Sequence, residues 1–80
     1  MARPLPDPVQ LYNTGSIYIP TAELRVLDQL VAGRTNVEIA EALFLSVNTV
    51  KTHLQRMNKK TGATTRAGLV AWAFRSGVYG

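Results

Sequence analysis

Five polar residues between positions 48 and 59 are spaced so that one face of a helix would carry them all. At 100° per residue they fall within an arc of about 100°. They are Asn48, Lys51, Thr52, Gln55 and Lys59. Lysine can donate hydrogen bonds to guanine, and glutamine or asparagine can pair with adenine through both amide groups. A helix is about 10–12 Å across and fits the major groove of B-DNA, which is about 12 Å wide.

This face contains no glutamate or aspartate, although both are common on helix surfaces. The alternative interpretation, the solvated side of an ordinary amphipathic helix, does not account for that absence. We therefore interpret Asn48, Lys51, Thr52 and Gln55 as candidate residues for reading DNA bases.

The helix that carries these residues is predicted to run over about 46–61. Its opposite side has a stripe for a core: Val47, Val50, Leu54, Met57 and Thr61. Ser46 is placed to cap its start and Gly62 to end it. Before it, Thr35-Asn36-Val37-Glu38 has the form of a capping box and predicts a shorter helix. Ile39 and Leu43 of that helix would face the core, and the turn at 44–46 predicts a helix-turn-helix.

Charge is divided unevenly along the chain. All five acidic residues lie at or before Glu41, whereas six basic residues follow it, and the net charge is +4. A positive face of this kind commonly binds nucleic acid, although a solvated basic surface without a partner is the alternative. Phosphate contacts are expected from the two ends of the helix and the segment after it. The candidates are Ser46, Thr49, Arg56, Lys59, Lys60 and Arg66.

Two further helices complete an all-α prediction. The first covers about 21–32, and Gly33 ends it. Its apolar stripe is formed by Leu24, Leu27 and Val31 and broadened by Val26 and Leu30. The last covers about 65–77 and is apolar almost all round. One side, with Leu69, Val70 and Ala73, is expected to face the core, and Trp72 lies elsewhere. An adjoining apolar side favours a two-fold homodimer, with Ala67, Val70, Ala71 and Phe74 as the expected interface.

The N-terminal part is expected to differ from the rest. Residues 1–8 hold three prolines and are expected to form an arm. Residues 9–19 could form a short hairpin or an extended strap, and a strap over the last helix is the alternative to dimerisation. We divide the chain into an arm over 1–18 and a DNA-binding domain over 19–80.

Enzymatic chemistry is not expected from this chain. It has 80 residues and no cysteine, and its one histidine, His53, lies beside the core stripe without a second metal ligand or a nucleophile. For the same reasons, no cofactor or metal ion is expected. No membrane partner is expected either, because no apolar run approaches the ~18 residues that span a bilayer. A cytoplasmic, nucleoid-associated protein fits these features.

Residues 19–77 resemble the LuxR-type (GerE/NarL-like) helix-turn-helix domain. The matching stretches are "E23-x-x-V26-L27", "N36-V37-E38-I39-A40-E41-x-L43", "S46-V47-N48-T49-V50-K51-T52-H53" and "K60-T61-G62-x-x-T65-R66". The resemblance implies four helices, with the third in the major groove and the fourth in a dimer. It also implies base-reading positions at Lys51, Thr52 and Gln55, and positions near phosphates at Thr49 and Lys60.

The chain departs from the family pattern at both ends of the core. Pro20 replaces the usual Thr and Ala22 the usual Arg, so we expect Thr21 to cap the first helix instead. Asn58 and Thr61 replace an apolar pair, which is expected to weaken the core there.

The prediction for function is a sequence-specific transcriptional regulator that binds double-stranded DNA as a homodimer. One alternative is a helix-turn-helix adaptor that acts through protein contacts in a transcription complex, with RNA polymerase as a partner. A purely structural helical dimer is the other alternative.

Overall fold

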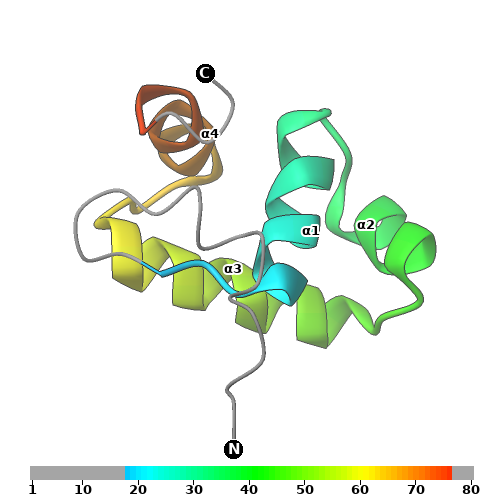
Figure 1. Ribbon diagram of the computed structural model, residues 1–80. Helices are drawn as coiled ribbons and strands as arrows, with labels where there is room; N and C mark the ends of the chain where they lie inside the picture. Colours follow the sequence, from blue (N-terminus) through cyan, green and yellow to red (C-terminus); the bar gives the residue numbers. More distant parts are fainter. Residues whose placement is uncertain (1–17, 77–80) are drawn as a thin grey trace, which may run out of the picture.

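The computed structural model describes residues 18–76, and all the regular structure in that range is helical. The helices are α1 (Thr21–Val31), α2 (Asn36–Leu43), α3 (Val47–Thr61) and α4 (Arg66–Arg75). Figure 1 shows α3 along one side, with α2 at its start, α4 at its end and α1 between them. The all-α, four-helix prediction is confirmed. The hairpin or strap predicted over 9–19 lies, except for Tyr18 and Ile19, outside the described residues.

One hydrophobic core joins the four helices. Its buried residues are Ile19, Val26, Leu27, Leu30, Ile39, Ala40, Val50, Leu54, Met57, Leu69, Trp72 and Ala73. The stripe predicted for α3 is confirmed at its centre, since Val50, Leu54 and Met57 are all buried. Trp72 is a correction, because it was placed away from the core side of α4 and is only 9% exposed.

The start of α1 differs from the prediction. Pro20, not Thr21, is the residue before the first helical turn, and it makes no side-chain capping bond. Proline already has the backbone φ that this position needs, and its carbonyl accepts the first helical hydrogen bond from Leu24 N–H at 2.9 Å. The Thr21 hydroxyl is buried and has no hydrogen-bond partner, so the prediction that it caps the helix is wrong.

The α1 stripe also differs in detail from the prediction. Leu24 and Val31 of the predicted stripe are only partly buried, whereas Val26 and Leu30, which were predicted to broaden it, lie deeper in the core. Gly33 ends the helix in a left-handed conformation with φ 87°, as predicted.

The end of α3 is closed by hydrogen bonds instead of apolar packing. The Thr61 hydroxyl donates to the carbonyl of Met57 at 2.8 Å and accepts from Ala63 N–H at 3.2 Å. The side-chain oxygen of Asn58, Oδ1, is buried without a hydrogen-bond partner, a feature expected to destabilise this end of the core. Gly62, with φ 79°, ends the helix in the left-handed conformation that glycine adopts without strain.

The capping box of α2 is formed as predicted. Thr35 Oγ1 accepts from Glu38 N–H at 3.2 Å, and Glu38 Oε1 accepts from Thr35 N–H at 2.8 Å. The pKa of the Glu38 carboxyl is lowered, first by the hydrogen bond from the Thr35 backbone N–H, with smaller contributions from the Thr35 side chain and the positive charge of Arg34. These bonds fix the start of the helix that supports α3.

Replacing Thr35 with alanine should destabilise the domain by about 1 kcal/mol, because one N–H at the start of α2 loses its acceptor. In the unchanged chain, the lowered pKa means that the charged Glu38 stabilises the fold above the carboxyl's unfolded pKa. That contribution is lost as the pH falls through the folded pKa. An NMR titration of Glu38 in both chains checks this. Thr35→Ala keeps the backbone N–H that is the main cause of the lowered pKa and removes only the smaller contribution of the Thr35 side chain, so the Glu38 pKa should rise slightly but stay below the ordinary value. An unchanged Glu38 pKa in the variant would contradict it.

Candidate nucleic-acid interface

The turn between α2 and α3 sets where the third helix begins. Phe44 takes a left-handed conformation, with φ 57° and ψ 43°, and Leu45 N–H then bonds to the carbonyl of Ala40 at 2.9 Å. Ser46 caps α3 as predicted, because its Oγ accepts from Thr49 N–H at 3.0 Å and donates to Thr49 Oγ1 at 2.8 Å. The Ser46 and Thr49 hydroxyls, both expected near phosphate, are therefore already hydrogen-bonded to each other.

The polar row on α3 is turned away from the core. Asn48, Lys51, Gln55 and Lys59 are exposed, and Thr52 is half-buried. The Thr52 hydroxyl donates to the carbonyl of Asn48 at 3.0 Å, so its remaining capacity is to accept. The chain thus presents amide and ammonium donors on one continuous helical face, and the assignment of these residues to base reading stays a prediction.

Glu23 was not predicted as part of this site. Its side chain is 3% exposed, and its Oε1 accepts from the Lys60 ammonium at 2.7 Å. Lys60 was expected at a phosphate, but one of its three donors is already bound to this carboxylate. The signal in the sequence was an acid on the apolar side of α1, within about 60° of both Val26 and Leu30 on the helical wheel. A buried acid requires a cation, and Lys60 supplies it.

His53 lies beside the same carboxylate. Its Nδ1 is 3.9 Å from Glu23 Oε2, which is too long for a hydrogen bond, and this nitrogen is buried without a hydrogen-bond partner. The side chain is half-buried, as the sequence indicated. Among residues 18–76, no group of three or more histidines and carboxylates is placed to hold a metal ion.

Arg66, another expected phosphate contact, joins two helix starts. Its guanidinium donates to Asn36 Oδ1 at 2.5 Å and to the carbonyl of Arg34 at 2.7 Å. These bonds connect the first residue of α4 to the first residue of α2. Because a guanidinium has five N–H donors, further donors remain for a phosphate.

Helices α1 and α2 differ in charge from α3 and α4. Glu23, Asp28, Glu38 and Glu41 all lie on α1 and α2, and Glu23 is matched by Lys60. By contrast, α3 and α4 carry no acid. Their basic residues are Lys51, Arg56, Lys59, Lys60, Arg66 and Arg75. The helix that presents the polar row is therefore also on the more positive side of the fold.

The outer side of α4 carries the expected dimer contacts. Ala67 and Ala71 are exposed and Phe74 is 54% exposed, while Val70 is partly buried against the core. In residues 18–76, none of the helices is both long enough and apolar enough to cross a bilayer.

The chain belongs to the luxR family of bacterial regulatory proteins, whose family model matches residues 21–73. That match runs from the first residue of α1 into α4. Proteins of this family are DNA-binding transcriptional regulators, which confirms the resemblance and the expectation that the chain is not an enzyme.

Relatives and a solved structure agree with this assignment. The transcriptional regulatory protein MctR of Rhizobium johnstonii is 42% identical over 64 residues, which cover 80% of this chain and 30% of MctR. The CsgBAC operon transcriptional regulatory protein of Escherichia coli is 44% identical over 63 residues, or 78% of this chain and 29% of that protein. The phage VqmA–DPO complex contains a chain with a TM-score of 0.74 and 31% identity, covering 80% of this chain and 29% of its own length. The chain thus spans less than a third of these proteins.

Proposed function

We propose that this domain binds double-stranded DNA in a sequence-specific manner with α3 in the major groove, and so regulates transcription. The observation that carries the proposal is the exposed, acid-free polar row on α3, which lies on the side of the fold that bears most of the positive charge. A helix of this width fits the major groove, and its amide and ammonium groups match the acceptors and donors of base edges. Such a protein would act at the nucleoid, in the cytoplasm.

The roles within the site follow from what each side chain already binds. Asn48, Lys51, Thr52 and Gln55 would contact bases. The phosphate contacts would come from Ser46, Thr49, Arg56, Lys59, Lys60 and Arg66. Lys59 and Arg56 are exposed and make the simplest phosphate ligands, whereas Lys60 and Arg66 would have to share donors with Glu23 and Asn36.

Replacing Gln55 with alanine should weaken binding to the preferred DNA by ~1–3 kcal/mol and relax the preference at one base pair. The preferred sequence would first be selected from random duplex DNA, and binding would then be measured at two salt concentrations. Because Gln55 is uncharged, the slope of affinity against salt should not change.

Lys59→Ala is the matched control for a phosphate contact. It should weaken binding on all sequences alike and reduce the salt slope by about one. Lys60→Ala should reduce the slope by less, since Glu23 already compensates that charge. If Gln55→Ala left both affinity and base preference unaltered, α3 would not be the reading helix, and an adaptor function would be favoured.

We also propose that two copies pair through α4, which places their α3 helices about one turn of DNA apart. The half-exposed Phe74 would anchor this contact between the exposed alanines. Phe74→Ala should shift sedimentation equilibrium toward monomer by tenfold or more in dissociation constant, while Phe44→Ala, which changes an exposed phenylalanine elsewhere, should not. A strict monomer at high concentration, both free and on DNA, would contradict the dimer.

A further inference from the structure

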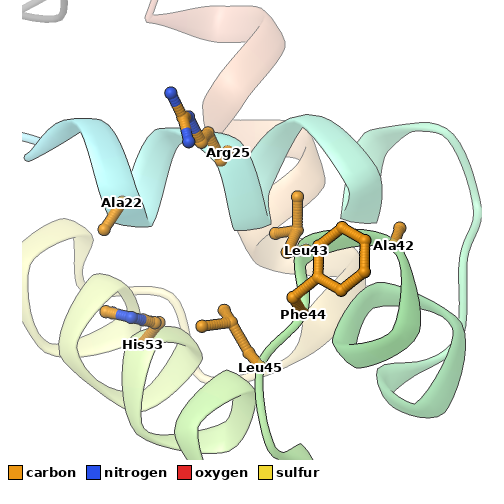
Figure 2. A pocket seen from close by; sticks show the side chains of 7 residues that line it. All are labelled: Ala22, Arg25, Ala42, Leu43, Phe44, Leu45 and His53. Carbon is orange, nitrogen blue, oxygen red and sulfur yellow. The ribbon is translucent and has the colours of Figure 1, made fainter.

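A groove of about 330 Å³ lies where α1, the end of α2 and the first half of α3 meet. Figure 2 shows Ala22 and Arg25 of α1 along one wall, with Leu45 and His53 along the other. Leu43 and Phe44 close one end. Apart from Arg25 and His53, the side chains that line this groove are apolar.

Phe44 is the residue at this groove that the fold itself does not explain. Its side chain is 96% exposed, so it adds almost nothing to the core. Its backbone is left-handed, with φ 57°, which is an unfavourable conformation for a residue with a side chain. Glycine would take this conformation without strain. A residue that is both strained and exposed points to a contact outside the domain.

Arg25 gives the groove its charge. It is exposed and forms no ion pair within residues 18–76. The facing wall from α3 adds only His53, and the acids of α2, Glu38 and Glu41, are exposed but do not line the groove. An unpaired guanidinium beside apolar side chains complements a carboxylate that is carried next to a large apolar group.

A protein segment fits this groove better than a small molecule or DNA does. A small ligand needs most of its surface buried, and a groove whose aromatic wall is 96% exposed does not provide that cover. A protein would cover Phe44 itself. DNA is disfavoured because the groove offers a single arginine among mostly apolar side chains, which is too little positive charge to hold a phosphate backbone.

The groove also stays accessible while α3 lies on DNA. On the α3 wheel, His53 points about 140–160° away from Asn48 and Gln55, so the groove and the polar row face different ways. We propose that this groove, defined by Ala22, Arg25, Leu43, Phe44, Leu45 and His53, docks an acidic amphipathic segment of a partner protein. Its large apolar side chain packs beside Phe44, and its carboxylate binds Arg25.

The test uses NMR titration of the whole ¹⁵N-labelled chain with a synthetic amphipathic helix that has leucines along one face and glutamates beside them. A matched peptide carries lysine in place of each glutamate. We expect shifts at Ala22, Leu43 and Leu45, and at least tenfold tighter binding of the glutamate peptide. Arg25→Glu should weaken that binding at least tenfold, whereas Arg75→Glu, an equal change of charge on α4, should have little effect.

Phe44→Gly provides a second variant that should fold at least as well, because it removes the backbone strain. This variant should weaken binding of the glutamate peptide at least tenfold and leave DNA binding unchanged. Three results would overturn the proposal: shifts confined to α3 and α4, equal effects of Arg25→Glu and Arg75→Glu, or no binding at all. Concentration-dependent shifts at the groove without peptide would assign it to a second copy of the chain and would also overturn it.

Discussion

Replacing Lys60 with methionine should lower the free energy of unfolding by about 3 kcal/mol. The change keeps most of the side-chain stem but leaves the Glu23 carboxylate buried without its cation. Removing one partner of a buried ion pair typically has an effect of about 3–5 kcal/mol. The low end applies here because the Lys60 side chain is 32% exposed, and water can reach the site once the ammonium is gone. Urea denaturation followed by Trp72 fluorescence measures the change.

A double-mutant cycle separates the ion pair from other effects of the substitution. Glu23→Gln should be less damaging than Lys60→Met, because a neutral amide can stay buried with fewer hydrogen bonds. The double variant should therefore lose less stability than the two single variants lose together, by at least about 1 kcal/mol. Strict additivity would mean that the pair, although 2.7 Å apart, contributes no coupling to stability.

Trp72→Ala should cost the domain about 3–5 kcal/mol, as expected for a large aromatic side chain removed from a core. That is a large share of the roughly 4–12 kcal/mol available to an 80-residue domain. Because α4 has only Leu69, Trp72 and Ala73 buried, it should detach from the core first. Trp72 is the only tryptophan, so circular dichroism in urea is the suitable measurement.

Phe74→Ala on the same helix is the control for that experiment. Phe74 is 54% exposed, and its loss should affect monomer stability by about 1 kcal/mol or less. Equal losses for the two variants would show that burial of Trp72 does not hold α4 in place.

The parts of this fold that the sequence predicted are those fixed by residues close together in the chain. The capping box joins Thr35 to Glu38, and the α3 cap joins Ser46 to Thr49, each over three residues. Gly62 ends α3 through its own backbone freedom. Local geometry of this kind depends on residue type and spacing alone, and both can be read without a structure.

Contacts between distant residues were not predictable in the same way. The Lys60–Glu23 bond spans 37 positions and the Arg66–Asn36 bond spans 30. Whether a basic side chain meets solvent, a phosphate or a buried acid depends on how helices pack, which periodicity does not specify. For α4 the apolar residues surround the helix, so its core side was predicted only in part. Leu69 and Ala73 are buried as predicted, whereas Trp72 was assigned to the wrong side. The left-handed conformation of Phe44 was also not predictable, because residues in such turns are usually glycines.

The position of Arg66 makes the starts of α2 and α4 dependent on each other. One guanidinium restrains both, so a partner that orders α4 would also reduce the freedom of Arg34, just before α2, and of Asn36, its first residue. Thermodynamic linkage is reciprocal. A ligand that orders the start of α2 must therefore raise the affinity for the partner on α4 by the same factor by which that partner raises the ligand's affinity. If α4 pairs two copies and the domain binds an operator, as proposed above, self-association and operator binding would become cooperative through Arg66, which is also one of the proposed phosphate contacts.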